Sequence, residues 1–78
     1  LLYILKNKKI ETNLIKNFHY FQSKRWDLSF YDGNLLRLPS KNLEKAIENF
    51  IAFKKQNDLI NNTTIDLRIS DRIIISNE

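Results

Sequence analysis

The segment 26–39 constrains the fold of this chain more than any other, because it holds the only Trp, the only Gly and the only Pro. Apolar and polar side chains alternate over residues 26–31, which is typical of a half-buried strand. Residues 32–34 follow as a turn, since Gly33 tolerates positive φ and its Asp and Asn neighbours favour turns. The alternation resumes over residues 35–38 and ends at the proline, which has no N–H to donate. The segment therefore predicts a β-hairpin with a three-residue loop at residues 32–34.

The composition predicts one small globular domain. Of the 78 residues, 42% are hydrophobic and 12% are aromatic, which argues against disorder. The absence of Cys excludes a disulfide framework and Cys-based metal sites. Because the chain also lacks Met and starts with an apolar run, we expect residues 1–78 to be one domain of a longer protein, with any membrane-spanning segment upstream.

The clearest helix pattern covers Leu43–Gln56. Apolar residues recur there at i, i+3, i+4, i+7 and i+8, which forms one apolar stripe that can cover one face of a sheet. Shorter helices are predicted over residues 1–5 and 10–18. The predicted strands are 18–21, 25–31, 35–38, 64–69 and 72–76. These elements predict an α+β fold, in which a strongly twisted antiparallel sheet has the long helix on one face and short N-terminal helices at one end.

An isoleucine run interrupts the alternation of the last predicted strand. Because Ile73, Ile74 and Ile75 are consecutive, one of them must project from the face that the long helix does not cover. A terminal strand with apolar residues on both faces either lies in the centre of a sheet or forms an edge that can accept a partner strand. The sequence leaves both positions open.

A set of short motifs is spread over residues 25–76. The set consists of Arg25-Trp26-Asp27-Leu28, Gly33, Leu38-Pro39, the long helix, Ile65-Asp66-Leu67-Arg68 and Asp71-Arg72. Their order and spacing resemble the C-terminal part of the bacterial cell-division family FtsQ/DivIB, and the chain looks most similar to its alphaproteobacterial members.

The resemblance implies a non-catalytic scaffold of the cell-division machinery, the divisome, which links early and late septation proteins. In the family, the full-length protein crosses the inner membrane once, and a POTRA domain and then this β domain lie in the periplasm at the division septum. The resemblance further implies that the domain binds the division proteins FtsB and FtsL by adding a partner strand beside its last strand. The residues to which it assigns partner binding are Arg25, Arg68, Ile69, Arg72, Ile73, Ile74, Ile75 and Ser76.

Strand parity places two arginines of this set on one face. An inward Trp26 turns Arg25 outward, and an inward Leu67 turns Arg68 outward. If the two strands lie near each other, both guanidinium groups can bind one acidic residue of the partner. The alternative, weighted equally, is that Arg25 and Arg68 pair with Asp66 and Asp27, in that order, as surface ladders between strands.

The alternative function is a small nucleic-acid-binding domain, because the net charge is +4 and aromatic residues lie near basic ones. The aromatic residues concerned are Tyr20, Phe21, Trp26, Phe30 and Tyr31. The parity that buries Trp26 and Phe30 argues against this role. An enzyme is the least expected class, since no carboxylates form a spaced pair and one Gly cannot build a phosphate-binding loop. No cofactor or metal is expected, because His19 is the only His.

Overall fold

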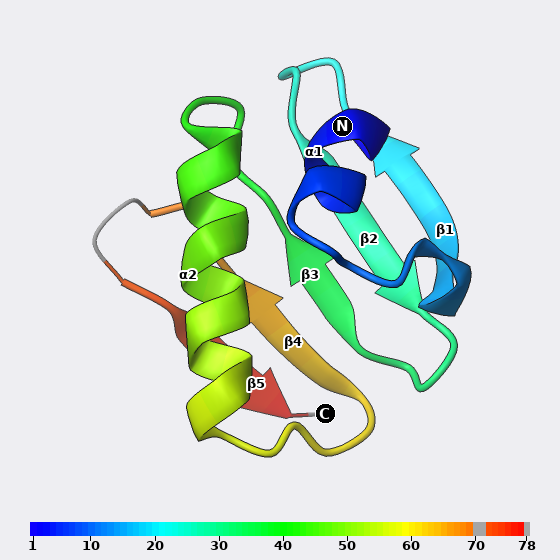
Figure 1. Ribbon diagram of the computed structural model, residues 1–78, viewed down its shortest axis with the longest axis vertical. Coiled ribbons are helices and arrows are strands. Elements are labelled where there is room, and N and C mark those ends of the chain that lie inside the picture. The colour runs from blue at the N-terminus through cyan, green and yellow to red at the C-terminus, as the bar shows by residue number, and fades with distance from the viewer. Residues whose placement is uncertain (70–71, 78) are drawn as a thin grey trace.

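The computed structural model describes residues 1–69 and 72–77, which form a five-stranded sheet with helices on one face (Figure 1). The strand order in the sheet is β1-β2-β3-β4-β5, so β1 and β5 are its two edges among the described residues. The elements are α1 (Leu2–Asn7), the 3-10 turn η1 (Thr12–Leu14), β1 (Ile15–Tyr20), β2 (Trp26–Phe30), β3 (Leu35–Arg37), α2 (Leu43–Gln56), β4 (Thr63–Asp66) and β5 (Ile74–Asn77).

The predicted α+β class is confirmed, but the sheet is mixed and not wholly antiparallel. β3 and β4 pair in parallel, whereas the other three pairings are antiparallel. The physical reason lies in the connection, since α2 carries the chain back along the sheet before β4 begins, as in a βαβ unit. Figure 1 shows β3 and β4 side by side with α2 in front of the sheet.

The core lies between the sheet and the two helices. The predicted stripe on α2 is confirmed, because Ala46, Ile47 and Phe50 are buried against the sheet. Fully burying a side chain the size of Ile47 stabilises the fold by about 1.5–3 kcal/mol. The buried apolar residues of the core are Leu5, Ile15, Leu28, Leu36, Leu38, Ala46, Ile47, Phe50, Ile65 and Leu67.

The predicted N-terminal helix over residues 10–18 is wrong. Only Thr12–Leu14 forms one 3-10 turn, and β1 then starts at Ile15 and pairs with β2. The apolar residues of this segment fit a helical spacing, but pairing with β2 supplies backbone partners that a short isolated helix cannot match. The register of β1 also shifts between Ile15 and Asn17, which marks a bulge.

The other strands occur where they are predicted, with different ends. β2 is one residue shorter at each end than the predicted 25–31, and β3 ends one residue before the predicted 38. β4 starts one residue earlier than predicted and ends at Asp66, three residues before Ile69. β5 begins two residues later than the predicted 72 and extends to Asn77.

The hairpin between β2 and β3 has the predicted odd loop length, and the loop lies one residue earlier than predicted. The Phe30 N–H donates to the Asn34 carbonyl at 2.9 Å, and the Gly33 N–H donates to the Phe30 carbonyl at 3.0 Å. The three loop residues are therefore 31–33. Leu28 pairs directly with Leu36, which puts both side chains in the core.

A buried asparagine joins this hairpin to the first residue of β4. The Thr63 N–H donates to Asn34 Oδ1 at 2.9 Å, and the Asn34 N–H and Nδ2 donate to the two carboxylate oxygens of Asp32 at 3.0 and 3.2 Å. Asn34 and Thr63 are both buried. Because an unpaired buried polar group costs about 1–3 kcal/mol, this contact favours one position of β3 beside β4.

Replacing Gly33 is expected to destabilise the domain, because its φ is +88° and an added Cβ would collide with the Asn62 side chain. A non-glycine residue held at such an angle costs roughly 1–3 kcal/mol. We therefore expect Gly33→Ala to lower the free energy of unfolding by about that amount in urea titrations. Ser23→Ala, in the exposed turn between β1 and β2, is the control and should change it by less than about 0.5 kcal/mol. Equal stability of Gly33→Ala and the wild type would contradict the strain.

Candidate functional site

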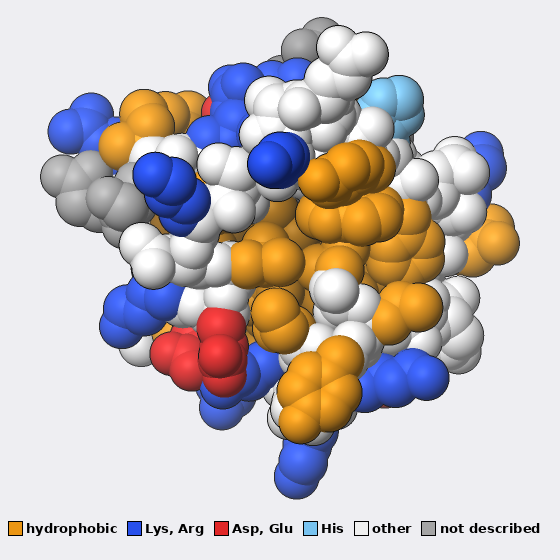
Figure 2. All heavy atoms as spheres, turned by 90° about the horizontal axis from the view of Figure 1, so that it is seen from above, with side chains coloured by type: hydrophobic (Ala, Val, Ile, Leu, Met, Phe, Trp, Pro, Cys, Tyr) orange, Lys and Arg blue, Asp and Glu red, His pale blue; other side chains and the backbone are white. Residues whose placement is uncertain are grey.

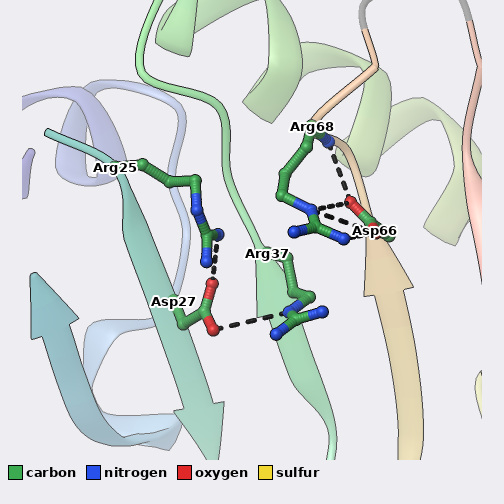
Figure 3. A network of polar contacts seen from close by, with 5 residues as sticks. All are labelled: Arg25, Asp27, Arg37, Asp66 and Arg68. Atoms are coloured by element: carbon green, nitrogen blue, oxygen red, sulfur yellow. Dashed lines mark hydrogen bonds and ion pairs between the residues drawn. The ribbon is translucent and has the colours of Figure 1, made fainter. Parts of the chain in front are cut away.

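Five charged side chains form a network on the sheet face that the helices do not cover (Figure 3). In the register of the sheet, Asp27 of β2 lies opposite Arg37 of β3, and Arg37 lies opposite Asp66 of β4. Arg25 lies two residues before Asp27, and Arg68 lies two residues after Asp66. Because side chains two residues apart share a face, all five point to the same side of the sheet.

The first part of this network surrounds a buried carboxylate. Asp27 is only 7% exposed. Arg25 Nη1 donates to Asp27 Oδ1 at 2.6 Å, and Arg37 Nε lies 3.5 Å from Asp27 Oδ2 as an ion pair without a hydrogen bond. A carboxylate can be buried only if positive charge or hydrogen bonds compensate for lost hydration, so the two arginines make this position possible.

The second part is a pair between Asp66 and Arg68. Arg68 Nε donates to both carboxylate oxygens of Asp66 at 2.9 and 3.1 Å, Nη2 donates at 2.7 Å, and the Arg68 backbone N–H adds a bond at 3.0 Å. The Arg68 side chain holds the pKa of Asp66 below its ordinary value, and Asp66 in turn raises the pKa of Arg68. Arg68 is thus fixed on the sheet face while 43% of its side chain remains exposed.

Both predicted arginines therefore lie on one face. The expected ladder partners are wrong, because each arginine pairs with the aspartate two residues away on its own strand segment and not with that of the other motif. They also line one cavity of about 380 Å³, together with Ile69 and Arg72. The structure thus brings four of the eight predicted site residues together. The other four form the segment 73–76, which runs into β5 at the sheet edge, where Ile73 packs against the core.

The edge strand β5 presents an apolar side chain on each face of the sheet. Ile75 pairs with Ile65 and shares its helix-covered face, whereas Ile74 pairs with Asp66 on the open face. Ile74 is 43% exposed and Ile75 is 40% exposed. The prediction that one isoleucine projects from the uncovered face is confirmed. Of the two positions that the sequence left open for this strand, the described residues place it at the edge.

Sequence reasoning missed Arg37 and two lysines of the cavity wall, Lys41 and Lys45. The signal for Arg37 was available, because inward neighbours on both sides turn it outward beside Asp27. For the lysines, a pair four residues apart at the start of the long helix was the available signal. The Asp71 of the Asp71-Arg72 motif lies outside the described residues.

The aromatic residues behind the nucleic-acid alternative do not share one surface. Trp26 contacts Phe18 and Tyr20 on the helix-covered face, whereas Phe21 lies under Arg25, whose Cζ is 4.3 Å from the ring centroid. Tyr31 lies in the hairpin loop at the other end of β2. Figure 2 views the molecule from the end where α1 begins and shows hydrophobic side chains gathered in one area, with lysines and arginines around it.

The described residues contain neither a metal-binding cluster nor a membrane-spanning helix. No three His, Cys, Asp or Glu side chains in residues 1–69 and 72–77 are arranged to hold a metal ion. In the same residues no helix has the length and hydrophobicity needed to cross a membrane.

These features define a small α+β domain with a charged sheet face beside an exposed edge strand. Residues 3–68 match the family model described as the C-terminal domain of cell division protein FtsQ/DivIB. The chain therefore belongs to the FtsQ/DivIB family, which is a non-catalytic cell-division domain, and the resemblance seen in the motifs is confirmed. The match includes Arg25 and Arg68 and ends before β5. No curated protein matches the chain.

The Asp66–Arg68 pair predicts a specific dependence of stability on pH. Because the folded state lowers the pKa of Asp66, the pair contributes stability above the ordinary pKa, and this contribution is lost as the pH falls through the lowered value. We expect Asp66→Asn to be less stable than the wild type in urea at about pH 7 and equally stable at about pH 2. Asp58→Asn removes an exposed carboxylate without an ion pair in the described residues, and it should change stability little at either pH. If Asp66→Asn differed in stability from the wild type by the same amount at both pH values, this role of the Asp66–Arg68 pair would be contradicted.

Proposed function

We propose that this domain is a non-catalytic scaffold of the divisome and binds the division proteins FtsB and FtsL through β5. The observation that carries the proposal is the position of β5, which pairs with β4 on one side and with no described residue on the other. An edge strand with free N–H and C=O groups is the template for β-augmentation. Membership of a cell-division family supports this kind of partner.

The side chains of β5 offer specificity on both faces. A partner strand beside β5 gains affinity from main-chain hydrogen bonds, and alternate side chains decide which sequences fit. Ile74 would pack against the partner on the open face, and Ile75 would do so on the helix side. Ser76 follows on the open face, beside Thr64. We infer that an apolar residue on each face of the partner strand is favoured.

The arginines supply the charged part of the proposed interface. Two of the five N–H donors of Arg68 lie on Nη1 and are not used by Asp66, so they are available for a partner carboxylate. Arg25 contributes less, because its side chain is only 14% exposed and Nη1 is bound to Asp27. Ile69 and Arg72 extend this surface from Arg68 towards β5.

The cellular setting is part of the same proposal. By its family, the full-length protein would be anchored in the bacterial inner membrane by a single span, with this domain in the periplasm at the division septum. FtsB and FtsL segments would then meet the domain outside the membrane, where an added strand can extend the sheet.

Proline substitutions in β5 test strand addition. In an edge strand, successive N–H groups point alternately to the neighbouring strand and to solvent, so one of Ile74→Pro and Ile75→Pro removes a bond to β4 and the other removes the outward donor. We expect the variant that keeps wild-type thermal stability to lose binding to the periplasmic FtsB–FtsL segment in isothermal titration. Retained binding by that stable variant would refute strand addition.

A substitution of Arg68 tests the charged contact separately from strand addition. Hydrogen bonds to charged groups contribute about 1.5–3 kcal/mol, so Arg68→Ala should weaken FtsB–FtsL binding by roughly 10–100-fold. Lys55→Ala removes one exposed positive charge at the far end of α2 and should leave the affinity within about twofold. An equal effect of the two variants would show that only net charge matters.

A further inference from the structure

The cavity lined by Arg25 and Arg68 has a second wall that the proposed partner contact does not use. It has a volume of about 380 Å³ and lies between the 67–69 segment after β4, the 39–42 linker and the first half of α2. Ala46 and Asn49 form the α2 side, and the small Ala46 side chain leaves room there. The space is larger than one carboxylate group needs.

The cavity wall is positively charged. Five of its described lining side chains are cationic, and none of the lining residues that the structure describes is Asp or Glu. The cationic residues are Arg25, Lys41, Lys45, Arg68 and Arg72. A concave surface lined by one sign of charge concentrates the field and attracts ions of the opposite sign.

Part of this charge has no internal counter-ion. Arg25 and Arg68 are balanced by Asp27 and Asp66, but Lys41 and Lys45 form no ion pair with any residue in the described part of the chain.

The two acidic residues of α2 are engaged on another side of the helix. Lys8 Nζ contacts Glu48 Oε2 at 2.7 Å and Glu44 Oε1 at 3.3 Å, which draws both carboxylates towards α1. Neither glutamate lines the cavity. Lys45 nevertheless lies near them, because it lines a neighbouring hollow with Glu44 and Glu48 and its charge adds to that of Lys8 in lowering the pKa of Glu48. Lys41 is the lysine of the cavity wall that has no such interaction with a carboxylate among the described residues.

We propose that this cavity binds a multiply charged phosphate group, of the size of a diphosphate. Lysine ammonium groups on one wall and guanidinium groups on the other offer donors from several directions, which suits the oxygens of a phosphate better than the plane of one carboxylate. The Ser40 and Asn42 positions at the start of α2 add polar groups to the same wall. This site goes beyond the partner contact, since its distinguishing residues are Lys41 and Lys45.

The test is an isothermal titration calorimetry experiment, in which inorganic pyrophosphate is added to the chain at constant ionic strength. The double variant Lys41→Ala/Lys45→Ala should bind at least about tenfold more weakly than the wild type. The matched control is Lys54→Ala/Lys55→Ala, which removes the same charge from the other end of α2 and should stay within about twofold. Equal weakening in the two variants, or no binding by the wild type, would overturn the proposal.

A second measurement does not depend on the variants folding. In ¹⁵N-resolved NMR spectra of the wild-type chain, pyrophosphate should shift the amide signals of residues 40–45 and 67–69 most strongly. Shifts centred on another surface would overturn the proposal. Because no partner protein is present, failure here leaves the β5 proposal untouched, and failure of the proline test leaves this one untouched.

The same variants distinguish two sources of the phosphate. Vesicles of phosphatidylcholine with phosphatidic acid present a phosphate on a lipid headgroup, whereas pyrophosphate is free in solution. Vesicle binding that is lost in Lys41→Ala/Lys45→Ala and kept in the control would assign the site to a headgroup. Pyrophosphate binding with the same dependence and no vesicle binding would assign it to a soluble ligand.

Discussion

The parallel pairing of β3 with β4 determines where the candidate functional surfaces of this domain lie. Because α2 returns the chain along the sheet, β4 is placed inside the sheet and β5 becomes the edge beyond it. The same pairing puts Asp66 opposite Arg37, and so brings Arg68 onto the face that holds Arg25. The cavity exists because α2 passes in front of the sheet at the end of β4. The exposed edge, the charged face and the cavity are therefore all consequences of the crossover from β3 through α2 to β4.

The parts of the fold that sequence could predict are those with a strong burial pattern. The hairpin and α2 each bury one face, so the spacing of their apolar residues carries the information. β1 has no such pattern, because five of its six residues are exposed and only Ile15 enters the core. Its strand conformation comes from pairing with β2. The parallel direction of β4 could also have been predicted from the sequence, because a helix between two strands favours a parallel pair.

The candidate site likewise has features that the sequence could predict and features that it could not. The outward direction of Arg25 and Arg68 follows from period two and could be predicted. The burial of Asp27 could not, because it results from the side chains of Arg25 and Arg37, which cover it from neighbouring positions. The cavity wall was equally hidden, since it combines a linker, a helix and a strand end whose distances appear only in the folded chain.

The bulge near the start of β1 gives the two edges of the sheet different roles. A strand that adds to an edge needs a continuous ladder in one register, and the shift between Ile15 and Asn17 interrupts that ladder. Lys16, at the bulge itself, also places a charge on this edge. β1 is thus protected against unwanted pairing and self-association, whereas the strand register of β5 against β4 is uninterrupted. Under the proposed function, β5 would recruit a partner strand while β1 would not extend the sheet on the other side.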